Sequence, residues 1–131
     1  MLKDWTEISG RNGNGADDES IFTREISKGK FVIVWQSPTG LSGVVLNEGV
    51  TPVETVDEST IDAAEDEIYG EDYEVILGLI DGGVTKMAYI DEFGDIFSCD
   101  GEAMLFSDEF IEFDADTVPS EFEGAAELFE F

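Results

Sequence analysis

The apolar stretch 73–106 constrains the fold of this chain more than any other feature. Turn-forming residues divide it at 81–83, 91–95 and 100–101. The segments between the turns, 73–80, 84–90, 96–99 and 103–106, are short and rich in apolar side chains. Short apolar segments separated by Asp-Gly and Gly-Gly steps are typical of consecutive antiparallel strands. The stretch therefore predicts an antiparallel β-meander.

Three further regions favour extended structure. Segments 21–26 and 30–35 are rich in β-branched and aromatic residues and predict a hairpin. A short strand is expected at 43–46, and Pro52 indicates an edge strand or a loop. We also expect a strand at 108–116, solvated on one side.

The N-terminal region is less clearly patterned. Residues 1–9 fit either a short strand or a helical turn, and the spacing of Leu2, Trp5 and Ile8 favours the turn. Segment 10–15 contains two Asn-Gly steps and predicts a loop.

Two helices complete the predicted fold. Residues 59–70 place Ile61, Ala64 and Ile68 on one face, which predicts a short internal helix. Residues 120–130 predict a C-terminal helix with an apolar stripe and, opposite it, Glu123, Glu127 and Glu130. We therefore expect one acidic globular domain over 1–131, of the α+β class, with a meander-dominated antiparallel sheet.

Negative charge is the strongest functional signal. The chain has 32 acidic and 6 basic residues, no His, and a net charge of −26. Residues 31–131 hold 26 of the acids against Lys86 alone, so the sequence lacks the basic side chains to neutralise them. The 10 Phe residues argue against a disordered acidic tail. Because like charges repel in the compact state, we expect stability to rise with added salt.

The charge and the motifs exclude several function classes. An anionic surface repels nucleic acids and acidic lipids, so we expect neither direct nucleic-acid binding nor a membrane. The absence of His and of nucleophile, phosphate and dinucleotide motifs argues against an enzyme. No acidic segment has EF-hand spacing, and we expect no cofactor and no metal site. Cys99 is the single cysteine, beside Asp100, and is expected to be inert in a reducing, cytoplasmic location.

The leading hypothesis is a DNA mimic that inhibits a basic nucleic-acid-binding protein. Its target would be a restriction, CRISPR, repair, nucleoid or regulatory protein, whose basic groove the carboxylates occupy in place of phosphates. Two alternatives remain open: an immunity protein that neutralises a basic nuclease toxin, and a halophile domain whose acids serve solvation. A homodimer formed through residues 129–131 also remains open.

The carboxylates expected to face the partner come from the two predicted helices and their surroundings. They are Asp62, Glu65, Asp66, Glu67, Glu71, Asp72, Glu109, Glu112, Asp114, Asp116, Glu121, Glu123, Glu127 and Glu130.

Overall fold

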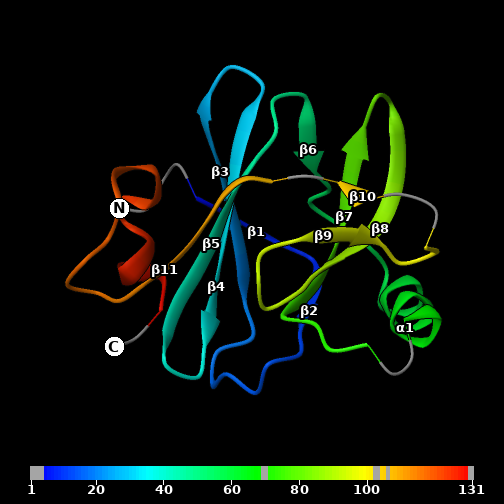
Figure 1. Ribbon diagram of the computed structural model, residues 1–131, viewed down its shortest axis with the longest axis horizontal. Helices are drawn as coiled ribbons and strands as arrows, with labels where there is room; N and C mark the ends of the chain where they lie inside the picture. The colour runs from blue at the N-terminus through cyan, green and yellow to red at the C-terminus, as the bar shows by residue number, and fades with distance from the viewer. Residues whose placement is uncertain (1–4, 69–70, 102–103, 106, 130–131) are drawn as a thin grey trace.

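Two antiparallel β-sheets form the centre of the fold, with a short helix outside one sheet and a bent helical segment outside the other (Figure 1). The structure, a computed structural model, describes residues 5–68, 71–101, 104–105 and 107–129. The predicted α+β class with antiparallel sheets is confirmed.

The first sheet is built around strand β4. Its order is β1 (Thr6–Ile8), β3 (Ile21–Ser27), β4 (Lys30–Ser37), β5 (Gly40–Leu46) and β11 (Ser107–Phe113). Both faces of β4 are covered, because Ile33 and Trp35 point into the space between the sheets while Val32 and Val34 point outward into a second core. A run of β-branched residues suits such a strand.

The second sheet contains the predicted meander. Its order is β10 (Met104–Leu105), β9 (Ile96–Ser98), β8 (Val84–Ile90), β7 (Val75–Asp81) and β2 (Gly10–Asn12). Strand β6 (Val50–Pro52) also pairs with β7, beyond the end of β2. Strands β7 to β10 pair in chain order, which confirms the meander; residues 103 and 106 of the predicted last segment lie outside the described residues.

The chain passes from one sheet to the other at their edges. Strands β1 and β2 follow one another in the chain but lie at the edges of different sheets, and the same holds for β10 and β11. Corners of this kind join sheets that pack face to face and leave little edge exposed. Gly10 stands at the first corner, where a Cβ atom would lie 2.4 Å from the Ile76 carbonyl oxygen. A side chain there would force the strand off the second sheet.

Three apolar cores hold four layers together. The central core lies between the sheets and includes Trp35 and Leu77. The second core lies between the first sheet and the C-terminal segment, and the third lies between the second sheet and helix α1 (Glu58–Glu67). Along the long axis of the molecule the order is C-terminal segment, first sheet, second sheet, α1 (Figure 1).

Three local predictions need correction. The helical turn favoured within 1–9 is wrong, because Thr6–Ile8 forms β1. The loop expected at 10–15 is wrong over Gly10–Asn12, which forms β2. Helical structure in the C-terminal region is confirmed, but as two 3-10 helices, Ser120–Phe122 and Ala125–Leu128. Gly124 between them has φ +84, a left-handed conformation that an α-helix does not contain.

Candidate acidic interaction surface

Helix α1 presents carboxylates because its other face is buried. Ile61 and Ala64 pack against Ile76 of β7 in the third core. Helical spacing then leaves Asp66 and Glu67 exposed on the outer side. Glu71 and Asp72, which follow the helix, are exposed as well. These acids are held on a packed element rather than on a loose tail.

Arg11 of β2 neutralises part of this helix. Its Nη2 lies 2.6 Å from Asp62 Oδ1 and 3.7 Å from Glu58 Oε1, and its Nη1 lies 2.9 Å from Glu65 Oε1. The hydrogen bond to Asp62 raises the pKa of Arg11, as does the bond to Glu65. Two of the predicted partner-facing acids, Asp62 and Glu65, are therefore already bound within the protein.

Tyr73 adds a second contact to Glu65. The Tyr73 hydroxyl donates a hydrogen bond to Glu65 Oε2. Burial raises the pKa of Tyr73, and the bond to the Glu65 carboxylate raises it further. Glu65, which is half-buried, thus serves to fasten α1 to the second sheet.

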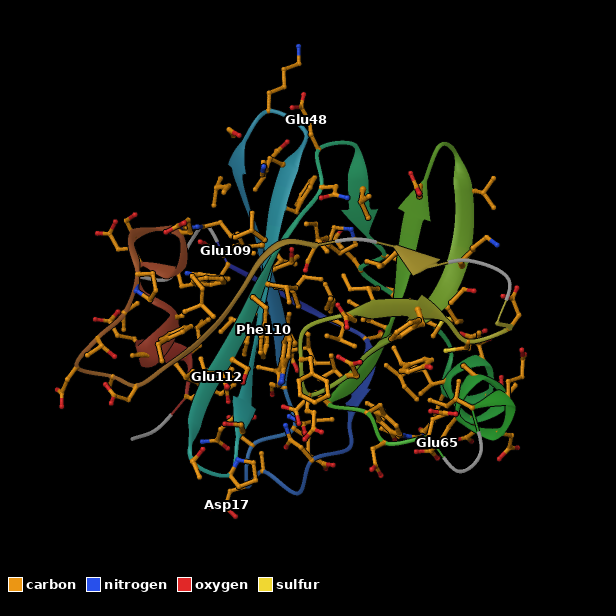
Figure 2. All side chains as sticks on the ribbon, viewed as in Figure 1. Asp17, Glu48, Glu65, Glu109, Phe110 and Glu112 are labelled. Carbon is orange, nitrogen blue, oxygen red and sulfur yellow. The ribbon has the colours of Figure 1, made fainter. Side chains whose placement is uncertain are left out.

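Strand β11 carries the next group of acids along the edge of the first sheet. Phe113 points into the second core, whereas Glu109 and Glu112 are exposed. Asp114 and Asp116 follow in an exposed turn. Asp114 Oδ1 accepts the Asp116 backbone N–H at 2.9 Å, which fixes the turn. Figure 2 shows Glu109 and Glu112 on this strand, on either side of Phe110.

The C-terminal segment is bound to the first sheet by its buried aromatic rings. Phe122 and Phe129 are buried against the outer face of the sheet. Glu123 and Glu127 are exposed and Glu121 is half-buried. The Glu123, Glu127 and Glu130 row was predicted for an α-helix; the two 3-10 helices change that spacing, and Glu130 lies outside the described residues.

Arg24 of β3 clamps this segment. Its guanidinium carbon lies 4.9 Å from the centre of the Trp5 ring. Nη1 donates to the Glu123 carbonyl at 3.1 Å, and Nη2 donates to the Glu121 carbonyl at 2.5 Å and the Ser120 carbonyl at 3.3 Å. Trp5 Nε1 also donates to the Glu123 carbonyl, at 3.0 Å. Arg24 thus contacts carbonyl oxygens and an aromatic ring.

The structure divides the predicted acids between two ends of the molecule. Figure 2 shows Glu65 beside α1, and Glu109 and Glu112 along β11, the edge strand of the first sheet. The acids of the C-terminal segment lie outside the first sheet, and Glu109 is on the same side of β11. Glu112 is on the other side of β11, the side that Phe110 occupies. The acids of α1, with Glu71 and Asp72, lie outside the second sheet. A single flat face does not contain both groups.

A groove beside Arg11 was not expected from the sequence. It has a volume of about 710 Å³ and lies where β1, β2 and α1 meet. Its lining includes Arg11 with the carboxylates of Glu7, Glu19, Glu54 and Glu58. The sequence separates these residues by up to 51 positions, so no local pattern indicates the groove.

The turn 91–95 presents an exposed aromatic side chain that the sequence analysis did not single out. Phe93, at its tip, is 72% exposed, and Glu92 and Asp95 on either side are exposed too. The sequence analysis treated 91–95 only as a turn; an aromatic residue inside an acidic turn, where no strand partner covers it, is the signal that could have identified this position.

The Cys99 thiol and the grouping of acidic side chains bear on reactivity and metal binding. Burial raises the pKa of the Cys99 thiol to about 12, with Glu67 and Asp100 adding to the effect. Within the described ranges, no group of three or more Cys, Asp or Glu side chains is arranged to hold a metal ion. No helix in the same part of the chain is long and apolar enough to cross a membrane.

Comparison with known proteins gives no family for this chain: no protein-family model, curated protein or solved structure matches it.

Proposed function

We propose that this protein is a DNA mimic that inhibits a basic nucleic-acid-binding protein by occupying its groove. One observation carries the proposal: exposed carboxylates lie on elements whose opposite sides are buried in a core. On β11 and the C-terminal segment, Phe113, Phe122 and Phe129 are buried while the acids between them face solvent. Like charges fixed this way oppose folding, so a role in binding is a reason to keep them.

The overall charge density supports the same function. The accessible surface is 7024 Å² and the net charge is −26, which gives about 270 Å² for each net negative charge. Duplex DNA, taken as a cylinder about 20 Å wide, has about one charge per 100 Å². Where acids gather at the ends of the molecule, the local charge density is higher than this average and closer to that of DNA.

The β11 end is the better candidate for the contact with the target. At the α1 end, Arg11 binds three carboxylates and lowers the local negative charge. At the β11 end, the cation nearest the C-terminal segment, Arg24, directs its N–H groups to carbonyl oxygens. The partner-facing set is therefore Glu109, Glu112, Asp114, Asp116, Glu121, Glu123 and Glu127.

The target follows from the chemistry of these acids. Carboxylates contact Lys and Arg side chains that otherwise bind phosphates, and steered association is fast at low salt. Restriction, CRISPR, repair, nucleoid and regulatory proteins offer such surfaces. Their site of action places this protein in the cytoplasm, and no catalytic step is proposed.

The test is capture followed by competition. The immobilised protein is incubated with nuclease-treated cell extract, and retained proteins are eluted by a salt gradient or by excess duplex DNA. We expect a nucleic-acid-binding protein that DNA displaces and whose DNA binding the free acidic protein abolishes. Retention of no such protein, or failure of DNA to compete, contradicts the proposal.

Matched charge reversals test which end binds. The double variant Glu123→Lys, Glu127→Lys should weaken binding by about tenfold or more at low salt and flatten its salt dependence. The variant Asp66→Lys, Glu67→Lys changes the net charge equally but at the α1 end, and should cost about threefold or less, since it alters only long-range attraction. Equal effects of the two variants would contradict the assignment to the β11 end.

A further inference from the structure

The turn 91–95 is rigid, although it projects into solvent. Asp91 Oδ1 accepts the backbone N–H groups of Phe93 and Asp95, both at 2.9 Å. The Asp91 N–H donates to the Asp95 carbonyl at 3.0 Å, and the Gly94 N–H donates to the Asp91 carbonyl at 3.1 Å. Four hydrogen bonds in five residues fix the backbone that carries Phe93.

The turn packs against strand β11. Gly94 has φ +83, and a Cβ atom there would lie 2.3 Å from Phe110 Cβ, so the backbone rests directly on Phe110. Ser107 Oγ donates to the Gly94 carbonyl at 3.2 Å. Phe110 in turn stacks on Trp35, with ring centroids 6.4 Å apart and an interplanar angle of 22°. The turn is thus tied to the central core.

The Phe93 ring is left outside this support. It is 72% exposed, the more exposed of the two large apolar side chains, Phe93 and Val84, that stand out from the described surface. Isolated exposed apolar residues are common. A ring on a pre-ordered turn differs, because little conformational entropy remains to be lost when it binds.

Three exposed carboxylates belong to the turn or to the strand beneath it. Glu92 and Asp95 belong to the turn, and both are exposed. Glu112 lies two residues after Phe110, on the side of β11 that meets the turn, because alternate residues of a strand share a face. Glu109 pairs with Val45, whose side chain faces the second core, so Glu109 points to the other side of the strand.

We propose that Phe93 is the anchor of the partner interface: it enters an apolar pocket in the target's basic surface, while Glu92, Asp95 and Glu112 contact Lys or Arg side chains at its rim. The inference rests on the proposed function and adds to it the source of selectivity. Carboxylates alone attract every basic protein, whereas a buried aromatic ring discriminates by shape and commonly dominates binding energy.

The charge argues against other occupants of this surface. A second copy of the chain would bring 26 further net negative charges to the same surface. An anionic membrane is repelled for the same reason. A basic protein is attracted by the same charge, and it is the occupant that we propose for this surface.

The experiment uses the DNA-displaced protein captured by the wild type, purified, as the probe. Its Kd is measured for the wild type, Phe93→Ala and Val84→Ala over a range of salt concentrations. Val84 is a matched control because it is also apolar and 55% exposed but lies at the far end of β8, about 20 Å from the turn at roughly 3.4 Å per residue. Thermal unfolding checks that both variants remain folded.

We expect Phe93→Ala to raise Kd by about tenfold or more at every salt concentration, with an unchanged slope of log Kd against log salt, since no charge is removed. Val84→Ala should bind as the wild type. Binding of Phe93→Ala within about twofold of the wild type, or an equal loss in Val84→Ala, overturns this inference and leaves the proposed function standing. If the wild type captures no DNA-displaced protein, the result contradicts both this inference and the proposed function.

Discussion

Cys99 shows how the environment of a single side chain decides its chemistry. The sequence predicted an inert thiol because Asp100 follows it. In the structure the larger cause is burial beneath α1, in the core that contains Ile61 and Ile76. The negative charges of Glu67 and Asp100 raise the pKa of Cys99 further. The thiol therefore stays protonated at neutral pH.

The raised pKa predicts a loss of stability in alkali. The Cys99 pKa rises from 9.0 to about 12 on folding, so between these values the unfolded chain has released a proton that the folded protein retains. Stability is then full below pH 9 and falls as pH rises towards 12. Urea unfolding across this range should show the decline, and Cys99→Ala should make it shallower. An unchanged slope in the variant would mean that Cys99 does not contribute.

The ion pairs of Asp62 and Glu65 could not be predicted from the residues around them. Both were expected to face a partner, since the chain around them contains no basic residue. Their cation, Arg11, lies more than fifty positions earlier, and β2 brings it to the helix by pairing with β7. The acidic character of α1 was readable from the sequence, whereas its partial neutralisation depends on strand pairing between distant segments.

At the scale of elements, apolar periodicity predicted burial better than it predicted backbone geometry. The pattern of the C-terminal region placed Phe122, Ala125, Ala126 and Phe129 in a stripe; Phe122, Ala125 and Phe129 are buried, and Ala126 is half-buried. The predicted helix is present as two 3-10 helices instead of one continuous helix, because the left-handed Gly124 divides the segment. Phe122 lies directly on Gly43 of β5, where a Cβ atom would meet the ring at 2.4 Å. The contact needs a glycine 79 positions away, which no local pattern contains.

The clamp on this segment predicts that Arg24 matters for stability. Arg24→Ala removes three hydrogen bonds to carbonyl oxygens and the stacking on Trp5. Hydrogen bonds that involve a charged group contribute about 1.5–3 kcal/mol, so we expect a loss of about 2 kcal/mol or more in the free energy of unfolding. Urea denaturation measures it.

Arg24→Lys serves as the control for charge. Lysine keeps the cation but lacks the planar fork that reaches several carbonyl oxygens at once, so only part of the stability should return. Full recovery in Arg24→Lys would show that charge, rather than the clamp geometry, holds the segment.

At the scale of the molecule, the four layers place two groups of predicted partner-facing acids at opposite ends: those of α1 with Glu71 and Asp72, and those of the C-terminal segment. Each outer layer covers one sheet (Figure 1) and is amphipathic: its apolar side chains pack on that sheet, and most of its acidic side chains face solvent. The sequence indicated this amphipathic character for each element. It did not indicate that the two acidic groups lie on different sides, because that depends on which sheet each element covers.

The same arrangement predicts that salt stabilises the fold. Repulsion acts across the whole molecule at low ionic strength, where the Debye length is about 30 Å at 0.01 M, and only locally at 0.15 M, where it is about 8 Å. Each kcal/mol of repulsion relieved should raise the Tm by about 4 °C in a chain of this size. Calorimetry between these NaCl concentrations measures the rise.

The double charge reversals provide the control for this salt effect. Asp66→Lys, Glu67→Lys reduces the net charge from −26 to −22. Repulsion grows faster than linearly with net charge, so the variant should gain less Tm on adding NaCl than the wild type. If the wild type and the variant gain equally, the stabilisation comes from a general effect of salt on hydration and not from relief of the repulsion between the carboxylates of the fold.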